Sequence, residues 1–236
     1  MLTAQIVQNV CSRIDEQDPA NPISVSNNEV LNAVNEGQLF ASFLTLFLVK
    51  TASFALSGLA FYNPRQILPD FLVPLRLSVG GIRLRPSTLT ELDGWNGAWQ
   101  ATAGPPARYA TIGSNLLAVT PQSAASMLFT YAASPPLMLL TPGDTPVIPP
   151  AYHQSLVEYS VYRVRLKEGA QQLARGLTNL NTYLDDMQKL GDWVRNRSKA
   201  SHYDVLPIEM ACLDRSKLID DILKRQAKIT QAGVVK

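Results

Sequence analysis

The spacing of apolar residues is helical in the first and last parts of the chain, and it indicates short strands in the middle. In residues 3–16 the apolar side chains recur every three or four positions, which predicts a helix with one apolar stripe. The stripe consists of Ile6, Val7, Val10, Cys11 and Ile14. Pro19 and Pro22 follow, and because proline lacks the backbone N–H and restricts the preceding residue, they end this helix.

A second helix is predicted to begin at Asn27. Ser26 and Glu29 form an S-x-x-E capping box, in which each side chain satisfies a backbone N–H at the start of a helix. From Leu39 to Leu56 the chain is almost entirely apolar, and we expect the helix to continue through this run. A helix that is apolar on nearly all sides must be covered on more than one face. Neighbouring copies of the chain would provide that cover, through the subunit-interface residues Phe40, Phe43, Leu44, Phe47 and Leu48.

The same run, residues 39–56, leaves a membrane-associated protein as an alternative. Its 18 residues are about the length of a membrane-spanning helix. Lys50 lies inside it, and a lysine near the centre of such a helix costs roughly 2.5–3.5 kcal/mol on insertion. We therefore expect a buried or subunit-facing helix and no membrane partner.

The middle of the chain predicts a small antiparallel β domain. Of the 16 prolines, 13 lie between residues 59 and 150, and short apolar runs separate them. The predicted strands are 73–79, 82–85, 107–112, 116–119 and 127–132. Gly80-Gly81 is a typical two-residue hairpin turn between the first two of these strands. We expect a sandwich of about five to seven strands.

Helical spacing returns after residue 150. Residues 152–167 form one predicted helix, and a narrow seam suited to packing on another helix follows. The seam is Leu173, Leu177, Leu180, Leu184, Met187, Leu190 and Val194. Residues 195–204 are polar and are interpreted as a linker to a last helix, 213–230. That helix is the predicted portal-docking element, with Leu213, Leu218, Ile219, Ile222, Leu223, Lys224 and Arg225 as its docking residues.

The predicted fold class is therefore α+β. A helical bundle forms from the N- and C-terminal helices, a small antiparallel β domain is inserted in it, and a C-terminal extension follows. The predicted division is 1–58 for the N-terminal helices, 59–150 for the β domain, 151–200 for the C-terminal helices and 201–236 for the linker and docking helix. The composition agrees, because 46% hydrophobic and 17% charged residues are typical of a globular protein with a real core.

Residues that could carry chemistry are few. Cys11 and Cys212 lie among apolar neighbours without metal-ligand spacing, so no metal site and no cofactor are expected. Glu91 and Asp93 are the pair that a wall-degrading enzyme would use, which is a second alternative. His153 and His202 have no sequence partner that indicates a catalytic dyad. Trp95 and Trp99 form either a loop core or an interface anchor.

Charge is distributed unevenly, although the net charge is only +2. Residues 1–60 carry two basic and five acidic side chains, and residues 160–200 carry eight basic and four acidic. The run Arg195, Arg197 and Lys199 suits either a solvated linker or a channel lining that touches DNA without reading its sequence. No stacking aromatic residue is evident within that run.

Turn and capping motifs occur in an order that resembles the head-to-tail adaptor (connector) proteins of tailed bacteriophages. They are Leu68-Pro69 before a strand, L-x-x-L-D at 89–93, GPPxxY at 104–109, LFTYAASPP at 128–136 and I-P-x-x-Y-H at 148–153. Trp95 and Trp99 lie between the second and third. The resemblance covers most of the chain, and it rests on the shared order of motifs that are each only moderately specific.

The resemblance implies a structural virion protein rather than an enzyme. It implies a homo-oligomer, a dodecameric ring below the portal protein that extends the DNA channel and receives tail or nozzle proteins. Transient, non-specific contact with genomic DNA would follow from that position. The implied location is the head–tail junction of the virion, with assembly in the host cytoplasm. A C-terminal extension that reaches the portal is common in such proteins, and 213–236 matches it by position alone.

Overall fold

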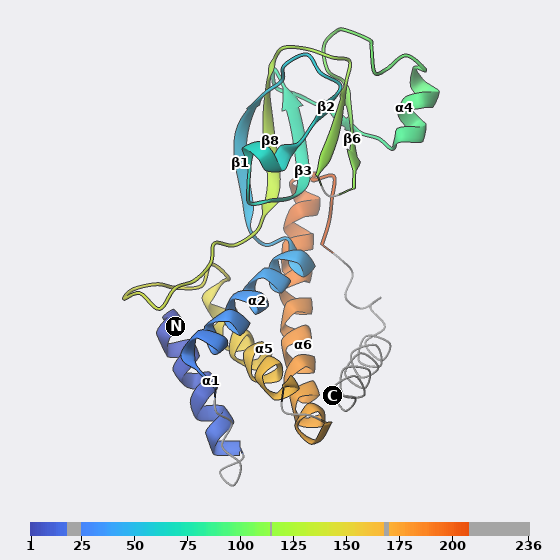
Figure 1. The fold of residues 1–236 in the computed structure, drawn as a ribbon. Helices are drawn as coiled ribbons and strands as arrows, with labels where there is room; N and C mark the ends of the chain where they lie inside the picture. The colour runs from blue at the N-terminus through green and yellow to red at the C-terminus, as the bar shows by residue number, and fades with distance from the viewer. Residues whose placement is uncertain (18–24, 114, 168–169, 208–236) are drawn as a thin grey trace, which may run out of the picture.

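The computed structural model describes residues 1–17, 25–113, 115–167 and 170–207, and it divides into a helical part and a β part (Figure 1). The helical part contains α1 (Thr3–Gln17), α2 (Asn27–Thr45), α5 (His153–Leu166) and α6 (Ala170–Ala200). The β part lies at one end of this bundle, and α6 runs from the far end of the bundle to the base of the β part. The α+β class, in which the N- and C-terminal helices pack together and the β part is inserted between them in the sequence, is confirmed.

The β part is a sandwich of two four-stranded sheets. The first has the order β1 (Val49–Ala55), β8 (Ser126–Ala133), β3 (Phe71–Val79) and β4 (Ile82–Arg83). The second has the order β2 (Phe61–Tyr62), β7 (Leu116–Thr120), β6 (Arg108–Ile112) and β5 (Arg85–Pro86). All neighbouring strands are antiparallel except β5 and β6. The inner faces meet in one apolar core that includes Phe54, Phe71 and Phe129 from the first sheet and Leu117 and Val119 from the second.

The predicted strands exist with small shifts at their ends. Gly80 and Gly81 have φ values of 58° and 82°, so the turn between β3 and β4 needs residues without a Cβ penalty at positive φ. The single strand expected at 82–85 is divided, because the buried Leu84 separates β4 in one sheet from β5 in the other. The chain therefore crosses between the sheets at this point.

The expectation of one helix through residues 39–56 is wrong after Thr45. The helix begins at Asn27 with the predicted capping box, but it ends where Leu46 adopts φ 50° and its N–H bonds to the carbonyl of Ser42. Residues 49–55 then form β1, which pairs with β8 along its length. The sheet thus begins ahead of residue 59. In the described residues, no helix combines the length and the apolar character that crossing a membrane requires.

Two other elements differ from expectation. A short helix, α4 (Leu89–Trp95), begins at Thr88, whose side chain forms a capping box with Glu91. The stretch 195–204 is a linker only in its last residues, because α6 continues to Ala200. Two further short helices, α3 (Pro64–Ile67) and η1 (Pro150–Tyr152), complete the described elements.

The helical core draws on all four long helices. Its buried members come from α1 (Ile6, Val10), from α2 (Val30, Val34), from α5 (Leu156, Val161) and from α6 (Tyr183, Met187). The seam on α6 is buried as predicted from Leu180 to Val194, since Leu180, Leu184, Met187, Leu190 and Val194 all lie in this core. The side chain of Leu173 lies outside the described set.

Candidate functional site

The outward side of α2 carries part of the predicted subunit interface. Phe43 is 48% exposed, and Leu39, which the prediction did not include, is 38% exposed. Phe40 is half-buried and packs on Tyr159 and Tyr183, with ring centroids 6.0 and 6.1 Å apart. Leu39 and Phe43, four positions apart, lie on the outward side of the helix, whereas Leu44, four positions after Phe40, lies toward the helical core and is buried there.

The last two predicted interface residues follow the end of α2. Phe47 is half-buried against the helical core, and Leu48 is half-buried against the core of the β part. The structure therefore brings Phe40 and Phe43 together with Leu39 at the surface and separates them from Leu44, Phe47 and Leu48.

An apolar groove of about 400 Å³ lies between α2, α5 and α6 at this surface. Its lining includes Leu39, Phe40, Phe43, Tyr159, Tyr162 and Leu180. Glu36 and Arg163 stand at the groove and form an ion pair of 2.8 Å, so their charges are already neutralised within the subunit. Burial raises the pKa of Tyr159 and that of Tyr162, so both rings remain neutral.

A second apolar element adjoins the groove. The segment between β8 and α5, residues 134–149 and called the arm here, runs out sideways from the body and returns to the start of α5 (Figure 1). Leu137 is 79% exposed at its beginning, and Leu139 is also exposed. A groove of about 570 Å³ between the arm and α2 shares Glu36 and Leu39 with the first groove. Leu39, Phe43, Leu137 and Leu139 therefore form one continuous surface, called the α2–arm face.

Polar side chains of α2 hold the arm in place. Asn35 accepts a bond of 2.7 Å from the N–H of Met138 and donates one of 3.1 Å to the carbonyl of the same residue. Gln38 is fully buried, and its Oε1 accepts the N–H of Val147 at 2.7 Å. Because the backbone on both sides is fixed, the exposed leucines are held outward. In the sequence, Asn35 and Gln38 are not distinguished from the neighbouring polar residues Asn32 and Glu36, so no local signal marks them as the anchors.

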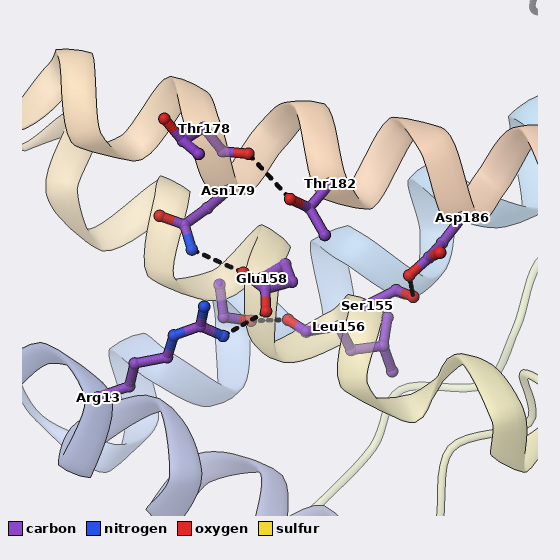
Figure 2. Close-up of polar contacts among 9 residues, drawn as sticks. Arg13, Ser155, Leu156, Glu158, Thr178, Asn179, Thr182 and Asp186 are labelled. Carbon is purple, nitrogen blue, oxygen red and sulfur yellow. Dashed lines mark hydrogen bonds and ion pairs between the residues drawn. The ribbon is translucent and has the colours of Figure 1, made fainter.

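Behind these surfaces, a buried polar network joins α1, α5 and α6 (Figure 2). Glu158 is buried, forms an ion pair with Arg13 through Oε1, and accepts a 2.6 Å bond from Nδ2 of Asn179 through Oε2. Ser155 donates to Asp186 at 2.7 Å nearby. Both carboxylate oxygens of Glu158 are thus engaged by neighbouring helices, so this group braces the bundle.

The carboxylates of Glu91 and Asp93 and the imidazole of His153, which were considered for chemistry, also have structural partners. Glu91 accepts the N–H of Thr88 at 2.7 Å, and this bond is the main reason that the pKa of Glu91 is lowered. Asp93 accepts the indole N–H of Trp99 at 2.8 Å. His153 is buried, donates from Nε2 to the carbonyl of Ile148 at 3.0 Å, and accepts the amino group of Met1 at Nδ1.

The remaining candidates divide between core and surface. Trp99 is buried in a small core with Leu92 and Ala110, which selects the loop-core interpretation for that residue. Trp95 is partly exposed beneath the guanidinium of Arg108. Cys11 is half-buried, and within the described parts of the chain no cluster of possible metal ligands occurs. The predicted portal-docking residues, from Leu213 to Arg225, and Cys212 lie outside the described residues.

Comparison with known proteins identifies the family. No curated protein matches the sequence. A family model does, and its description is "SU10 adaptor protein"; the match covers residues 1–202, which include the helical part, the β part and the arm. The resemblance predicted from the order of motifs is confirmed. This chain belongs to the SU10 adaptor protein family, a family of structural phage head-to-tail adaptor proteins.

Proposed function

We propose that the protein is the subunit of a ring that joins the portal to the tail and continues the DNA channel of the virion. Membership of an adaptor family over residues 1–202 is the observation that carries this proposal. In the proposed assembly the ring is dodecameric, it forms in the host cytoplasm, and it receives tail or nozzle proteins on the side away from the portal.

The α2–arm face supports the ring. A closed ring uses head-to-tail contacts in which one surface of each subunit covers a different surface of the next. Permanent interfaces are apolar, and aromatic residues are enriched where such interfaces are fully buried. Phe43 and Leu39 present that chemistry on a helix, and Leu137 presents it on the anchored arm. We assign the subunit contact to this face, together with the partly exposed edge of Phe40.

The contact with the portal is assigned to the C-terminal segment. Its residues Leu213, Leu218, Ile219, Ile222 and Leu223 form an apolar stripe in the sequence, and Lys224 and Arg225 follow the stripe. The family match ends at residue 202, so this segment lies beyond the part that the family model covers. Because the segment lies outside the part that the family shares, we expect its sequence to be specific for the portal of one particular phage.

Assembly of surface variants tests the ring. Replacing Leu39 and Phe43 together by serine removes apolar surface from the face without touching the core. The control is Leu59→Ser, because Leu59 is 59% exposed on the β part, away from the face. Light scattering after size exclusion, with the portal protein co-expressed, is expected to show ring-sized complexes for the wild type and the control only. If the double variant assembled normally, the face would not be the subunit contact.

Truncation tests the portal contact separately. A chain that ends at Pro207 keeps every described residue and loses the docking segment. We expect it to lose co-elution with the portal while it remains folded, as measured by circular dichroism. A truncated chain that still co-elutes would move the portal contact to the described part.

A further inference from the structure

The last turns of α6 carry a stripe of basic side chains around an exposed tryptophan. Lys189, Trp193 and Arg197 follow each other at intervals of four residues, so they share one side of the helix. Trp193 is 50% exposed, and the guanidinium carbon of Arg197 lies 4.4 Å from the centroid of its ring. Lys199, also exposed, is two residues further on and therefore lies on another side of the helix. The name α6 stripe is used here for Lys189, Trp193 and Arg197 together with this neighbouring lysine.

Among the residues that the structure describes, nothing neutralises the charge at the end of the stripe. From Trp193 to Tyr203 the sequence contains no acidic residue. Lys189 is paired with Asp186 at 2.9 Å, but neither Arg197 nor Lys199 has an ion-pair partner among the described residues. The basic residues beside the α2–arm face differ, since Arg163 and Lys167 are paired with Glu36 and Glu29.

Trp193 also fixes the direction in which Arg197 points. A guanidinium stacked on an aromatic ring is held there by a favourable cation–π contact, and it still presents its N–H groups at the edge. Because the stacked arginine has already lost rotamer freedom, it loses less when it binds an anion. Trp193 is thus a positioning residue, which holds the guanidinium of Arg197 in an orientation suited to binding an anion.

We propose that the α6 stripe contacts the phosphate backbone of double-stranded DNA, with Arg197 and Lys199 as the contacting groups. The inference rests on the proposed function, because a ring at the head–tail junction is traversed by the genome. Two or three charges per subunit bind weakly, but repetition around a ring adds their contributions. Contact with phosphates alone is independent of sequence, so DNA is guided without being held at one site.

The composition of the stripe favours DNA over a protein partner. Lysine is depleted at protein interfaces relative to the rest of the surface, whereas the apolar groups of the α2–arm face are typical of them. Tryptophan and arginine do occur at the energetic centres of protein interfaces, so a protein partner is the competing outcome of the test.

The test measures binding of a short fluorescent duplex of mixed sequence by the full-length chain at several salt concentrations. The variant is Arg197→Gln with Lys199→Gln. The matched control is Arg108→Gln, because Arg108 also lies over a partly exposed tryptophan, Trp95, but close to Glu91. We expect the double variant to lose roughly a hundredfold in affinity at about 0.1 M salt and the slope against log salt to fall by about two, with the control unchanged.

Intrinsic fluorescence provides a second readout. In a Trp95→Phe background the emitting residues are Trp193 and the buried Trp99, so quenching by the duplex reports on the stripe. Quenching that Arg197→Gln abolishes supports the proposal. Duplex binding that is absent, that survives in the double variant, or that falls equally in the control would overturn it.

Portal co-elution, measured on the same proteins, separates the two proposals. Loss of portal co-elution in the double variant with unchanged duplex binding means that the stripe is a protein contact, and the inference is then wrong. A wild-type chain that never associates with the portal, yet binds duplex through Arg197, would refute the adaptor role alone.

Discussion

The helical part and the β part place their polar groups in opposite ways. In the helical part, buried polar side chains link one helix to the next: Glu158 bonds to α1 and α6, and the hydroxyl of Tyr183 donates to the carbonyl of Gly37 at 2.8 Å. In the β part, the core is aromatic and aliphatic, and ion pairs lie at its margin, where the buried carboxylate of Asp204, from the segment after α6, pairs with Arg83 and accepts a bond from Tyr109. Lys50 and Asp70 form one such pair across the surface of the first sheet.

The difference follows from how each part satisfies its backbone. Strands bond to their neighbours, so the register of a sheet is fixed by the ladder itself. Helices satisfy their backbone internally and pack through side chains alone, so buried polar links can select one arrangement among several apolar ones. We infer that the helical part, which carries the proposed subunit contact, is the more sensitive of the two to single substitutions.

The close packing of α2 on α5 at Gly37 gives the largest expected effect. A Cβ atom at Gly37 would lie 2.8 Å from Cδ1 of Tyr159, whose ring is buried between Phe40, Tyr162 and Tyr183. Because that ring cannot move aside, Gly37→Val should lower the free energy of unfolding by at least about 3 kcal/mol. Urea denaturation measures the loss.

Gly191→Ala is the control for that substitution. Its Cβ would meet only Thr45, at an ordinary 3.8 Å, and alanine is the better helix former. This variant should gain about 0.5–1 kcal/mol. A Gly37→Val protein as stable as the wild type would show that α2 and α5 do not pack as closely as described.

The ion pair between Arg13 and the buried Glu158 gives the next largest effect. Removing Arg13 and removing the charge of Glu158 should lower the stability by different amounts. Arg13→Ala leaves the carboxylate of Glu158, only 8% exposed, with Asn179 as its remaining partner. We expect a loss of about 2–3 kcal/mol, because an uncompensated buried charge is costly. Glu158→Gln should cost less, since the side chain of Arg13 is 32% exposed and its charge can turn toward water. Equal losses for the two variants, measured by urea denaturation, would contradict this ranking.

An exposed ion pair of the β part is the matched comparison. The side chains of Lys50 and Asp70 are 46% and 29% exposed. Removing the pair by Lys50→Ala should change stability by less than about 1 kcal/mol, as is usual for surface pairs. If this loss equalled that of Arg13→Ala in the same denaturation series, the contrast between the two parts would not hold.

The spacing of apolar residues predicted most helices and strands, because in each of them the side that is buried can be read from its own sequence. The stripe of the first helix and the seam from Leu180 to Val194 are buried on one side, as their spacing indicates. The end of α2 could not be predicted in this way. Leu46 adopts φ 50° without glycine, and the residues that follow pair with the distant strand β8. Lys50 pairs with Tyr131, 81 positions later, and Val49 with Ala132, 83 positions later. Pairing with a distant strand therefore determines that residues 49–55 form a strand, and the local sequence pattern carries no information about that pairing.

Two further differences had a signal in the sequence. Thr88 and Glu91 are spaced as a capping box, which predicts the α4 helix and assigns Glu91 to the cap rather than to acid catalysis. The polar run after Val194 contains neither glycine nor proline before Ala200, so nothing in it ends a helix. Of the surface site, Phe43 and Phe40 were predicted, but the arm was not, because exposure of Leu137 depends on the anchors at Asn35 and Gln38.

The smallest effect concerns pH and the buried His153. Burial is the main cause that lowers the pKa of this imidazole in the folded protein, and the nearby amino group of Met1 acts in the same direction. The unfolded chain therefore binds the proton more tightly, so stability is complete above the ordinary pKa of about 6.5 and falls as pH drops below it toward the lowered folded value. Urea midpoints at pH 7.5, 6.5 and 5.5 should decline for the wild type, and more gently for His153→Gln, which cannot titrate there. Parallel declines would mean that other groups cause the pH dependence and that titration of the buried His153, in contrast to the buried charge of Glu158, does not affect the stability of the helical part.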